Sequence, residues 1–230
     1  MFKTTAKDRV LKAIALEETD RVPMDFSANP PTLARLKAEL GCEDHYVLLK
    51  KLGSDIVDLR GVVDPVYKGP VPYQKTLANG VKENYWGWRI KTEQTATGPE
   101  EMFCDFILAD KSFDQIKKHR WPEVDWFDFS DFNKRLQKWR EFAVMASGPS
   151  VWQHPGFLRG FDNLMADLLL EPETAEYLMD SFTDFYIAYF DKMFSTAPGQ
   201  VDILRIADDI GTQDGLIMSR DMFLRFILPR

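Results

Sequence analysis

The stretch "VDILRIADDIGTQDG", residues 201–215, decides the fold that we expect for this chain. It begins with an apolar run, Val201–Ile206, that is typical of a buried strand. Asp208 and Asp209 follow the run, and a Gly-Thr-Gln-Asp-Gly turn comes next. Two acids at the end of a buried strand belong either to the mouth of an active site or to a solvated loop. The rest of the chain helps to decide between these alternatives.

Strands and helices are expected to alternate along most of the chain. Apolar runs predict three further strands, at residues 22–26, 55–61 and 142–147. Periodic apolar residues, capping residues and Gly or Pro stops predict helices in the other segments. These helices are expected at residues 6–18, 31–40, 44–52, 112–122, 129–141, 157–169, 172–196 and 219–230. Such alternation implies parallel strand pairing with right-handed crossovers.

Residues 62–108 interrupt this alternation. They contain Asn79-Gly80, a strong hairpin signal, so a β-rich excursion is expected there. No Gly-x-Gly-x-x-Gly follows the first predicted strand, which argues against a dinucleotide-binding sheet. A (β/α)₈ TIM barrel is therefore the favoured α/β fold. Four predicted strands are half of the eight that close such a barrel, so residues 1–230 are expected to form a single, incomplete barrel domain.

The composition indicates a soluble globular protein. Of the 230 residues, 45% are hydrophobic and 28% charged, and the net charge of −7 argues against nucleic acid and anionic membranes as partners. No signal peptide is recognisable, and no apolar run approaches the roughly 20 residues of a spanning helix. The two cysteines, Cys42 and Cys104, are expected to be free thiols in a reducing cytoplasm.

Several stretches together resemble the uroporphyrinogen decarboxylase superfamily. They are "RVLKAIALEETDRVPMDF" (9–26), "LGSDIVDLRG" (52–61), "WPEVD" (121–125), "GFLRGFDNLMADLLLEPE" (156–173) and "ADDIGTQDGLIMSRDMFLRFILPR" (207–230). The resemblance covers nearly the whole chain and is closest to the branch that includes corrinoid methyltransferases. It implies a (β/α)₈ barrel with its pocket at the carboxyl ends of the strands, and methyl transfer between a corrinoid and a small donor or acceptor.

Two departures from this family are informative. Uroporphyrinogen decarboxylases carry a basic "RQAGRY"-type motif after the first strand, whereas this chain reads "DFSANPP" (25–31), with no basic residue from Met24 to Leu33. Because paired arginines would hold the substrate carboxylates, decarboxylation of a porphyrinogen is the alternative rather than the leading hypothesis. Family members also continue past Arg230, so the chain is expected to be truncated at its C-terminus.

The expected catalytic residues are Asp208, Asp209 and His154. Strand carboxyl ends face the active site of a barrel, so either acid could transfer a proton or accept a hydrogen bond from a ligand. The alternative is that these acids only cap a turn. Of the three histidines, His154 alone lies in a predicted loop after a strand, where it would line the pocket or serve a structural role.

Four further residues are expected to bind substrate. Asp25 stands where the resemblance places substrate contacts, Trp152 offers an aromatic wall, Arg159 a cation and Gln213 a hydrogen-bonding amide. Each has a plain alternative, such as a turn acid for Asp25 or a helix-surface ion pair for Arg159. Asp58 and Arg60 alternate with apolar residues along the second strand and form its polar side.

No metal site is expected from this chain alone. Cys42-x-x-His45 is the best local pair, but it straddles a helix stop and zinc needs three or four protein ligands. The resemblance implies zinc and a corrinoid in the complete protein, with the zinc ligands in the part that follows Arg230. The implied partners are a small-molecule substrate and a corrinoid protein. A hypothesis of another class is a non-catalytic half-barrel that binds a partner or forms a homodimer through its open sheet edge.

Overall fold

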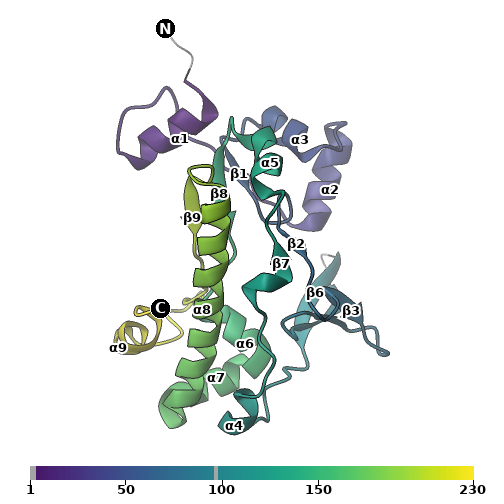
Figure 1. The fold of residues 1–230 in the computed structure, drawn as a ribbon, viewed down its shortest axis with the longest axis vertical. Helices are drawn as coiled ribbons and strands as arrows, with labels where there is room; N and C mark the ends of the chain where they lie inside the picture. The colour runs from purple at the N-terminus through teal and green to yellow at the C-terminus, as the bar shows by residue number, and fades with distance from the viewer. Residues whose placement is uncertain (1–3, 96–97) are drawn as a thin grey trace. The chain divides into compact units, whose positions relative to one another are not determined.

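The computed structural model describes residues 4–95 and 98–230 of the chain (Figure 1). Residues 96–97 of the predicted excursion, and the first three residues of the predicted domain, lie outside this range. The chain divides into two compact units. Unit 1 comprises residues 4–65, 129–148 and 193–205, and unit 2 comprises residues 66–128, 149–192 and 206–230. The fold is mixed α/β and contains a parallel sheet.

Unit 1 is built on this parallel sheet, whose strand order is β1-β8-β9. The strands are β1 (Ile56–Asp58), β8 (Ala143–Ser147) and β9 (Ile203–Arg205). The register pairs Asp58 with Met145 and Ser147 with Arg205. The apolar runs predicted as strands at 55–61, 142–147 and 201–207 therefore do pair in parallel. Val57, Val144 and their neighbours in β8 are buried, because a central strand is covered on both faces.

The strand predicted at residues 22–26 does not form. Met24 makes a single backbone contact with the chain ahead of β1, in which its carbonyl accepts from the Asp55 N–H at 2.7 Å. Its own N–H donates to a carboxylate oxygen of Asp55 instead of to a strand, and Pro23 has no N–H to offer. The segment is therefore extended but outside the sheet, which has three strands where four were expected.

Charged residues tie the amino-terminal helix to the amino ends of the strands. Helix α1 (Ala6–Ile14) has a capping box formed by Thr5 and Asp8. Its Arg9 bridges Asp20 and the buried Asp55, which directly precedes β1. Arg21 donates to the same Asp55 carboxylate. Asp20 and Arg21, the first two residues of the segment "DRVP" (20–23), thus fix how the chain enters the sheet.

The other helices of unit 1 pack beside β1 and β8. They are α2 (Pro30–Glu39), α3 (His45–Leu52), α5 (Phe132–Leu136) and the 3₁₀ turn η2 (Gln137–Trp139). The Asn29 side chain caps α2, and Gly53 ends α3 in the left-handed conformation with φ of 70°. The core between them is made by buried apolar side chains, namely Leu48, Leu49, Phe132, Leu136, Trp139 and Phe142. By contrast, α2 has no buried residue.

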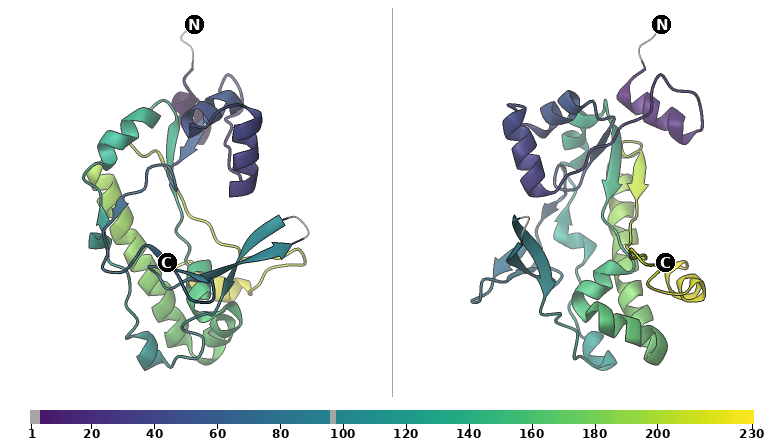
Figure 2. Two further views of the ribbon diagram at one scale, coloured as in Figure 1. Left: turned by 90° about the vertical axis from the view of Figure 1, so that its right-hand side faces the viewer. Right: turned by 180° about the vertical axis from the view of Figure 1, so that it is seen from behind.

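Unit 2 contains the predicted β-rich excursion. Its antiparallel sheet has the order β3-β4-β5-β6, with β3 (Gln74–Thr76), β4 (Lys82–Asn84), β5 (Arg89–Thr95) and β6 (Gly98–Cys104). The Asn79-Gly80 turn joins β3 to β4, with Gly80 at φ of 80°, as the sequence predicts. The short strands β2 (Val66–Tyr67) and β7 (Phe127–Asp128) form a second antiparallel pair. Figure 2 shows β5 and β6 as the longest pair of strands.

The helices of unit 2 carry an aromatic core. They are α4 (Phe113–Ile116), η1 (Val124–Trp126), α6 (Gln153–Arg159), α7 (Phe161–Leu170), α8 (Pro172–Thr196), α9 (Arg220–Met222) and the π-helical turn η3 (Phe223–Ile227). The part of α8 that belongs to unit 2 ends at Lys192. The rings of Trp86 and Phe182 stack at 4.4 Å in this core. The single helix predicted at 157–169 is interrupted at Gly160, whose φ of 80° an L-residue rarely adopts. Within the described residues, no helix is long and apolar enough to cross a membrane.

Candidate functional site

The last residues of the three parallel strands form one hydrogen-bonded cluster. The Ser147 hydroxyl at the end of β8 lies 2.7 and 2.5 Å from the two carboxylate oxygens of Asp58 at the end of β1. Arg205, which ends β9, donates from Nη2 to Asp58 Oδ2 at 3.2 Å. The carboxyl ends of parallel strands meet at one edge of the sheet, and the three polar side chains meet there with them. We refer to Asp58, Ser147 and Arg205 as the strand-end cluster.

The chain after β1 adds to this cluster. The Arg60 backbone N–H donates to Asp58 Oδ1 at 3.0 Å, so Asp58 also orders the turn that follows its own strand. After β8, Gly148 has a φ of 127°, a conformation that suits glycine. The Asp58 carboxylate therefore receives donors from β8, β9 and its own turn.

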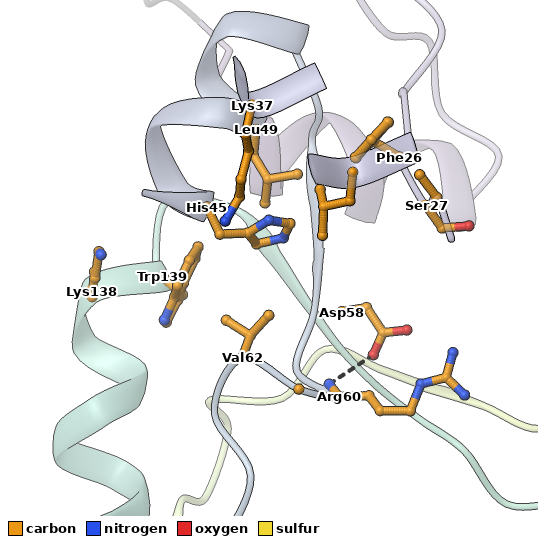
Figure 3. A pocket seen from close by; sticks show the side chains of 13 residues that line it. Phe26, Ser27, Lys37, His45, Leu49, Asp58, Arg60, Val62, Lys138 and Trp139 are labelled. Atoms are coloured by element: carbon orange, nitrogen blue, oxygen red, sulfur yellow. Dashed lines mark hydrogen bonds between the residues drawn. The ribbon is translucent and has the colours of Figure 1, made fainter. Parts of the chain in front are cut away.

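A pocket of about 450 Å³ opens beside Asp58, within unit 1. This volume lies in the range of about 300–1,000 Å³ that is usual for small-molecule sites. Figure 3 shows Asp58 and Arg60 on one side of the pocket, and Lys37 extending toward His45 on the other. The lining residues are Phe26, Ser27, Ala28, Leu33, Lys37, His45, Leu49, Asp58, Arg60, Gly61, Val62, Lys138 and Trp139.

The charges around this pocket are mainly positive. Lys37, Arg60 and Lys138 line it, and Lys138 is paired at 2.7 Å with Asp44, the N-cap of α3. Burial, and after it the charge of Lys37, lowers the pKa of His45 below its ordinary value of 6.5. The imidazole is therefore uncharged at neutral pH and can donate or accept a hydrogen bond.

The structure places Asp208 in a structural contact within unit 2. Its carboxylate accepts the backbone N–H groups of Val151, Trp152 and Gln153 at 2.8, 3.1 and 2.9 Å. The Ser150 hydroxyl also donates to it. Asp208 thus orders the loop between β8 and α6. A catalytic role for it stays a prediction, and it would have to act while holding these donors.

The other two predicted catalytic residues flank the same loop. Asp209 is exposed, and the Gln153 side-chain amide donates to it at 2.7 Å. His154 Nδ1 lies 2.7 Å from the hydroxyl of Tyr186 in α8, and the Trp88 ring lies 4.7 Å from the imidazole. Burial raises the pKa of Tyr186 well above its ordinary value, so its hydroxyl keeps its proton. Asp209 and His154 therefore lie on either side of the loop that Asp208 orders, and a catalytic role for each stays a prediction.

Arg159 and Trp152, two of the predicted substrate-binding residues, are turned to the protein interior. The Arg159 guanidinium pairs with the buried Asp167 in α7 through Nε and Nη2, at 2.7 and 3.0 Å. Its Nη1 donates to three backbone carbonyls of the segment 108–111. Trp152 is 1% exposed and packs beside Phe161. Both side chains hold α6 against its neighbours, and a substrate contact for either stays a prediction.

The remaining predicted residues are exposed and separate. Asp25 accepts the N–H of Phe26 at 2.8 Å and does not line the pocket, although its neighbours Phe26, Ser27 and Ala28 do. Gln213 lies in the exposed turn 211–215. Asp25 belongs to unit 1, whereas the six other predicted site residues belong to unit 2.

Sequence reasoning missed most of the strand-end cluster. The polar side of β1, with Asp58 and Arg60, could be read from its alternation with apolar residues. Ser147 and Arg205 lie at or near the ends of the predicted strands 142–147 and 201–206, and no functional role was predicted for either. The signal that could have identified them is their position as the last residue of parallel strands.

The residues described here do not form a zinc site. Over 4–95 and 98–230, no group of three or more His, Cys, Asp or Glu side chains could hold a metal ion. Cys42 is buried, and the His45 ring packs at 6.2 Å from the ring of Trp139. Structural and catalytic zinc sites use three or four protein ligands, so the donor set of the described residues does not fit this metal.

Comparisons with known proteins give a similarity among the solved structures. No protein-family model matches the chain, and no curated protein does. Among solved structures, the chain is similar to a methyltransferase from Methanosarcina mazei, with 16% sequence identity and a TM-score of 0.58. The match covers 98% of this chain and 64% of the methyltransferase, so the chain spans less than two thirds of that protein's length. At this level of identity, the similarity shows the fold alone.

Proposed function

We propose that this chain carries the small-molecule site of a methyl-transferring enzyme related to the uroporphyrinogen decarboxylase superfamily. The observation that carries the proposal is the strand-end cluster, in which Asp58, Ser147 and Arg205 meet at the carboxyl edge of a parallel sheet beside a pocket. This edge is where barrel enzymes bind and convert their substrates. A solved structure of similar fold is that of a methyltransferase, which supports the same reaction class.

The residues of the strand-end cluster suit the proton chemistry of such a transfer. An acceptor X–H must lose its proton before X⁻ attacks the methyl carbon, while the bond from methyl to donor breaks and its electron pair stays with the donor. Asp58 is the carboxylate that takes this proton, and Ser147 and Arg205 hold it in place. A corrinoid is the proposed methyl carrier, and when bound it would supply the methyl group as an electrophile.

The test is methyl transfer from methylcobalamin to a panel of small thiols, with the thioether product measured by mass spectrometry. We expect thioether to form faster with the protein than without it. In Asp58→Asn the rate of thioether formation should fall at least about tenfold, because the general base that takes the proton is lost. Asp162→Asn, an exposed acid in α7, is the matched control and should keep the rate. Absence of thioether with every thiol would overturn the proposal. Release of CO₂ from uroporphyrinogen would then favour decarboxylation.

A second candidate function, self-association, is favoured by the edge strand β9. β9 pairs only with β8 in its sheet, and Leu204 at its centre is 42% exposed. Open apolar sheet edges are templates for pairing with another chain. If the chain acts as a self-associating module, the mass measured by light scattering should be that of a dimer, and Leu204→Lys should return it to a monomer. A monomeric wild-type chain would overturn this alternative.

A further inference from the structure

The pocket of unit 1 combines apolar walls with an excess of positive charge. Two cations near it are already neutralised, since Arg205 is paired with Asp58 and Lys138 with Asp44. Within the described residues, Lys37 and Arg60 make no such ion pair. They leave the pocket with positive charge that an anion would compensate.

The face of helix α2 that lines the pocket is not buried by the rest of the protein. Leu33 and Lys37 are four residues apart, so they lie on the same face of the helix, and both line the pocket. Leu33, Leu36 and Leu40, the apolar stripe that the sequence predicts, are all only half-buried. A ligand with an apolar part would cover Leu33 and complete the packing of this face.

The polar and apolar groups are distributed on different parts of the lining. Figure 3 shows Lys37 beside His45 at one side, and Arg60 beside Asp58 at the other. Trp139, Leu49 and Val62 also line the pocket and supply flat and aliphatic surface. An uncharged His45 next to Lys37 can add a neutral hydrogen bond to the same acidic group that Lys37 attracts.

We propose that this pocket binds a small organic anion with a flat apolar part, whose acidic group is held by Lys37 and His45. The apolar part lies against Trp139 and Leu33, and the end of the ligand nearest Arg60 reaches Asp58 of the strand-end cluster. The proposal deepens the proposed function, on which it rests for the identity of the ligand as a substrate. It also assigns the anion contact to Lys37 of α2, since the preceding residues 24–33 contain no basic side chain.

Binding is tested by isothermal titration calorimetry of the whole chain with sodium benzoate, in the absence of any methyl donor. Benzamide, which has nearly the same shape but no charge, is the comparison. We expect benzoate to bind at least about tenfold more tightly than benzamide, because one charge-assisted contact is worth about one decade of affinity. Lys37→Ala should remove this preference. Lys134→Ala, an exposed cation in α5 that does not line the pocket, should keep it.

A second measurement locates the bound probe. In an NMR titration, benzoate should shift the ring signals of His45, assigned with a His45→Gln variant, and the shift should vanish in Lys37→Ala. Equal affinities for benzoate and benzamide would overturn the proposal, as would a benzoate affinity that Lys37→Ala leaves intact. The absence of binding heat at benzoate concentrations up to about 10 mM would also overturn the proposal, because even a few simple contacts give dissociation constants in the millimolar range.

The two proposals fail in distinguishable ways. If thioether forms but benzoate does not bind, the methyl-transfer proposal stands and the anion pocket is wrong. If benzoate binds through Lys37 but no thioether forms, the pocket is an anion site of an enzyme or binding protein of another kind.

Discussion

The Ser147 hydroxyl joins the end of β8 to Asp58 at the end of β1, a residue 89 positions earlier in the chain. A hydrogen bond to a charged group contributes about 1.5–3 kcal/mol when well buried. Both residues are half-buried, so we expect Ser147→Ala to lower the free energy of unfolding by about 1–2 kcal/mol in urea titrations.

Ser181→Ala is the matched control for this change. The Ser181 hydroxyl donates only to the Tyr177 carbonyl of its own helix, at 2.7 Å, and a bond of this kind adds little to helix stability. Similar losses in the two variants would contradict a specific role for the strand-end cluster.

The second prediction concerns Asp55, whose side chain is 1% exposed and contacts both Arg9 and Arg21. Asp55→Asn leaves two guanidinium groups without their buried counter-charge. Breaking a buried ion pair in this way costs about 3–5 kcal/mol, so the urea midpoint should fall strongly. Glu39→Gln, which breaks the exposed pair of Glu39 with Arg35, should leave the midpoint almost unchanged. A mild effect of Asp55→Asn would show that the network at the amino ends of the strands is dispensable.

The third prediction is a pH dependence from Asp20. The hydrogen bond from Arg9, opposed by partial burial, lowers the pKa of Asp20 from 3.8 to about 2 in the folded chain. A depressed carboxyl pKa stabilises the fold above the unfolded value, and this stabilisation is lost as the pH falls from 3.8 toward 2. The melting temperatures of the wild type and Asp20→Asn should therefore differ at pH 5 and converge near pH 2. A difference that does not change over this range would argue against the Arg9 contact.

The fourth prediction separates the two roles of Asp208. Asp208→Asn retains one acceptor oxygen and loses the charge, so the donors from Ser150 to Gln153 are only partly satisfied. We expect faster amide hydrogen exchange at residues 151–153 and a loss of about 1–3 kcal/mol in stability. Ser150→Ala disturbs the same loop but leaves the carboxylate in place. If methyl transfer falls in Asp208→Asn and persists in Ser150→Ala, Asp208 has a chemical role beyond ordering the loop.

Local patterns in the sequence predicted most of the elements but not their partners. The apolar runs at 142–147 and 201–207 predicted strands that form, and Asn79-Gly80 predicted its hairpin. The run at 22–26 is similar in composition, but Pro23 and the Asp55 carboxylate keep it out of the sheet. That outcome depends on a residue about 30 positions away, which no local pattern contains. Because this strand does not form, Asp25 does not belong to the parallel sheet, and its predicted substrate contact stays a prediction.

In the candidate site too, single residues could be predicted from local sequence patterns, whereas their long-range contacts could not. Asp58 and Arg60 could be recognised as the polar side of a strand, because side chains alternate between faces. Their contacts with Ser147 and Arg205 depend on the register of three strands taken from distant parts of the chain. Asp208 was predicted to be catalytic, but the sequence could not show that its carboxylate accepts the N–H groups of residues 151–153.

Arg159 has a consequence for how this sequence can diverge. Three of its hydrogen bonds go to the main-chain carbonyls of Leu108, Ala109 and Lys111, and these carbonyls are present whatever side chains occupy the positions. Asp167 is the side chain that pairs with the guanidinium, and Asn163 donates to the Ala109 and Arg159 carbonyls. Substitutions at the exposed Asp110 and Lys111 are therefore compatible with an unchanged anchor, whereas loss of Arg159 or of Asp167 leaves the other without its ion-pair partner. An anchor built on main-chain atoms allows a fold to persist while most of the residues around it are replaced.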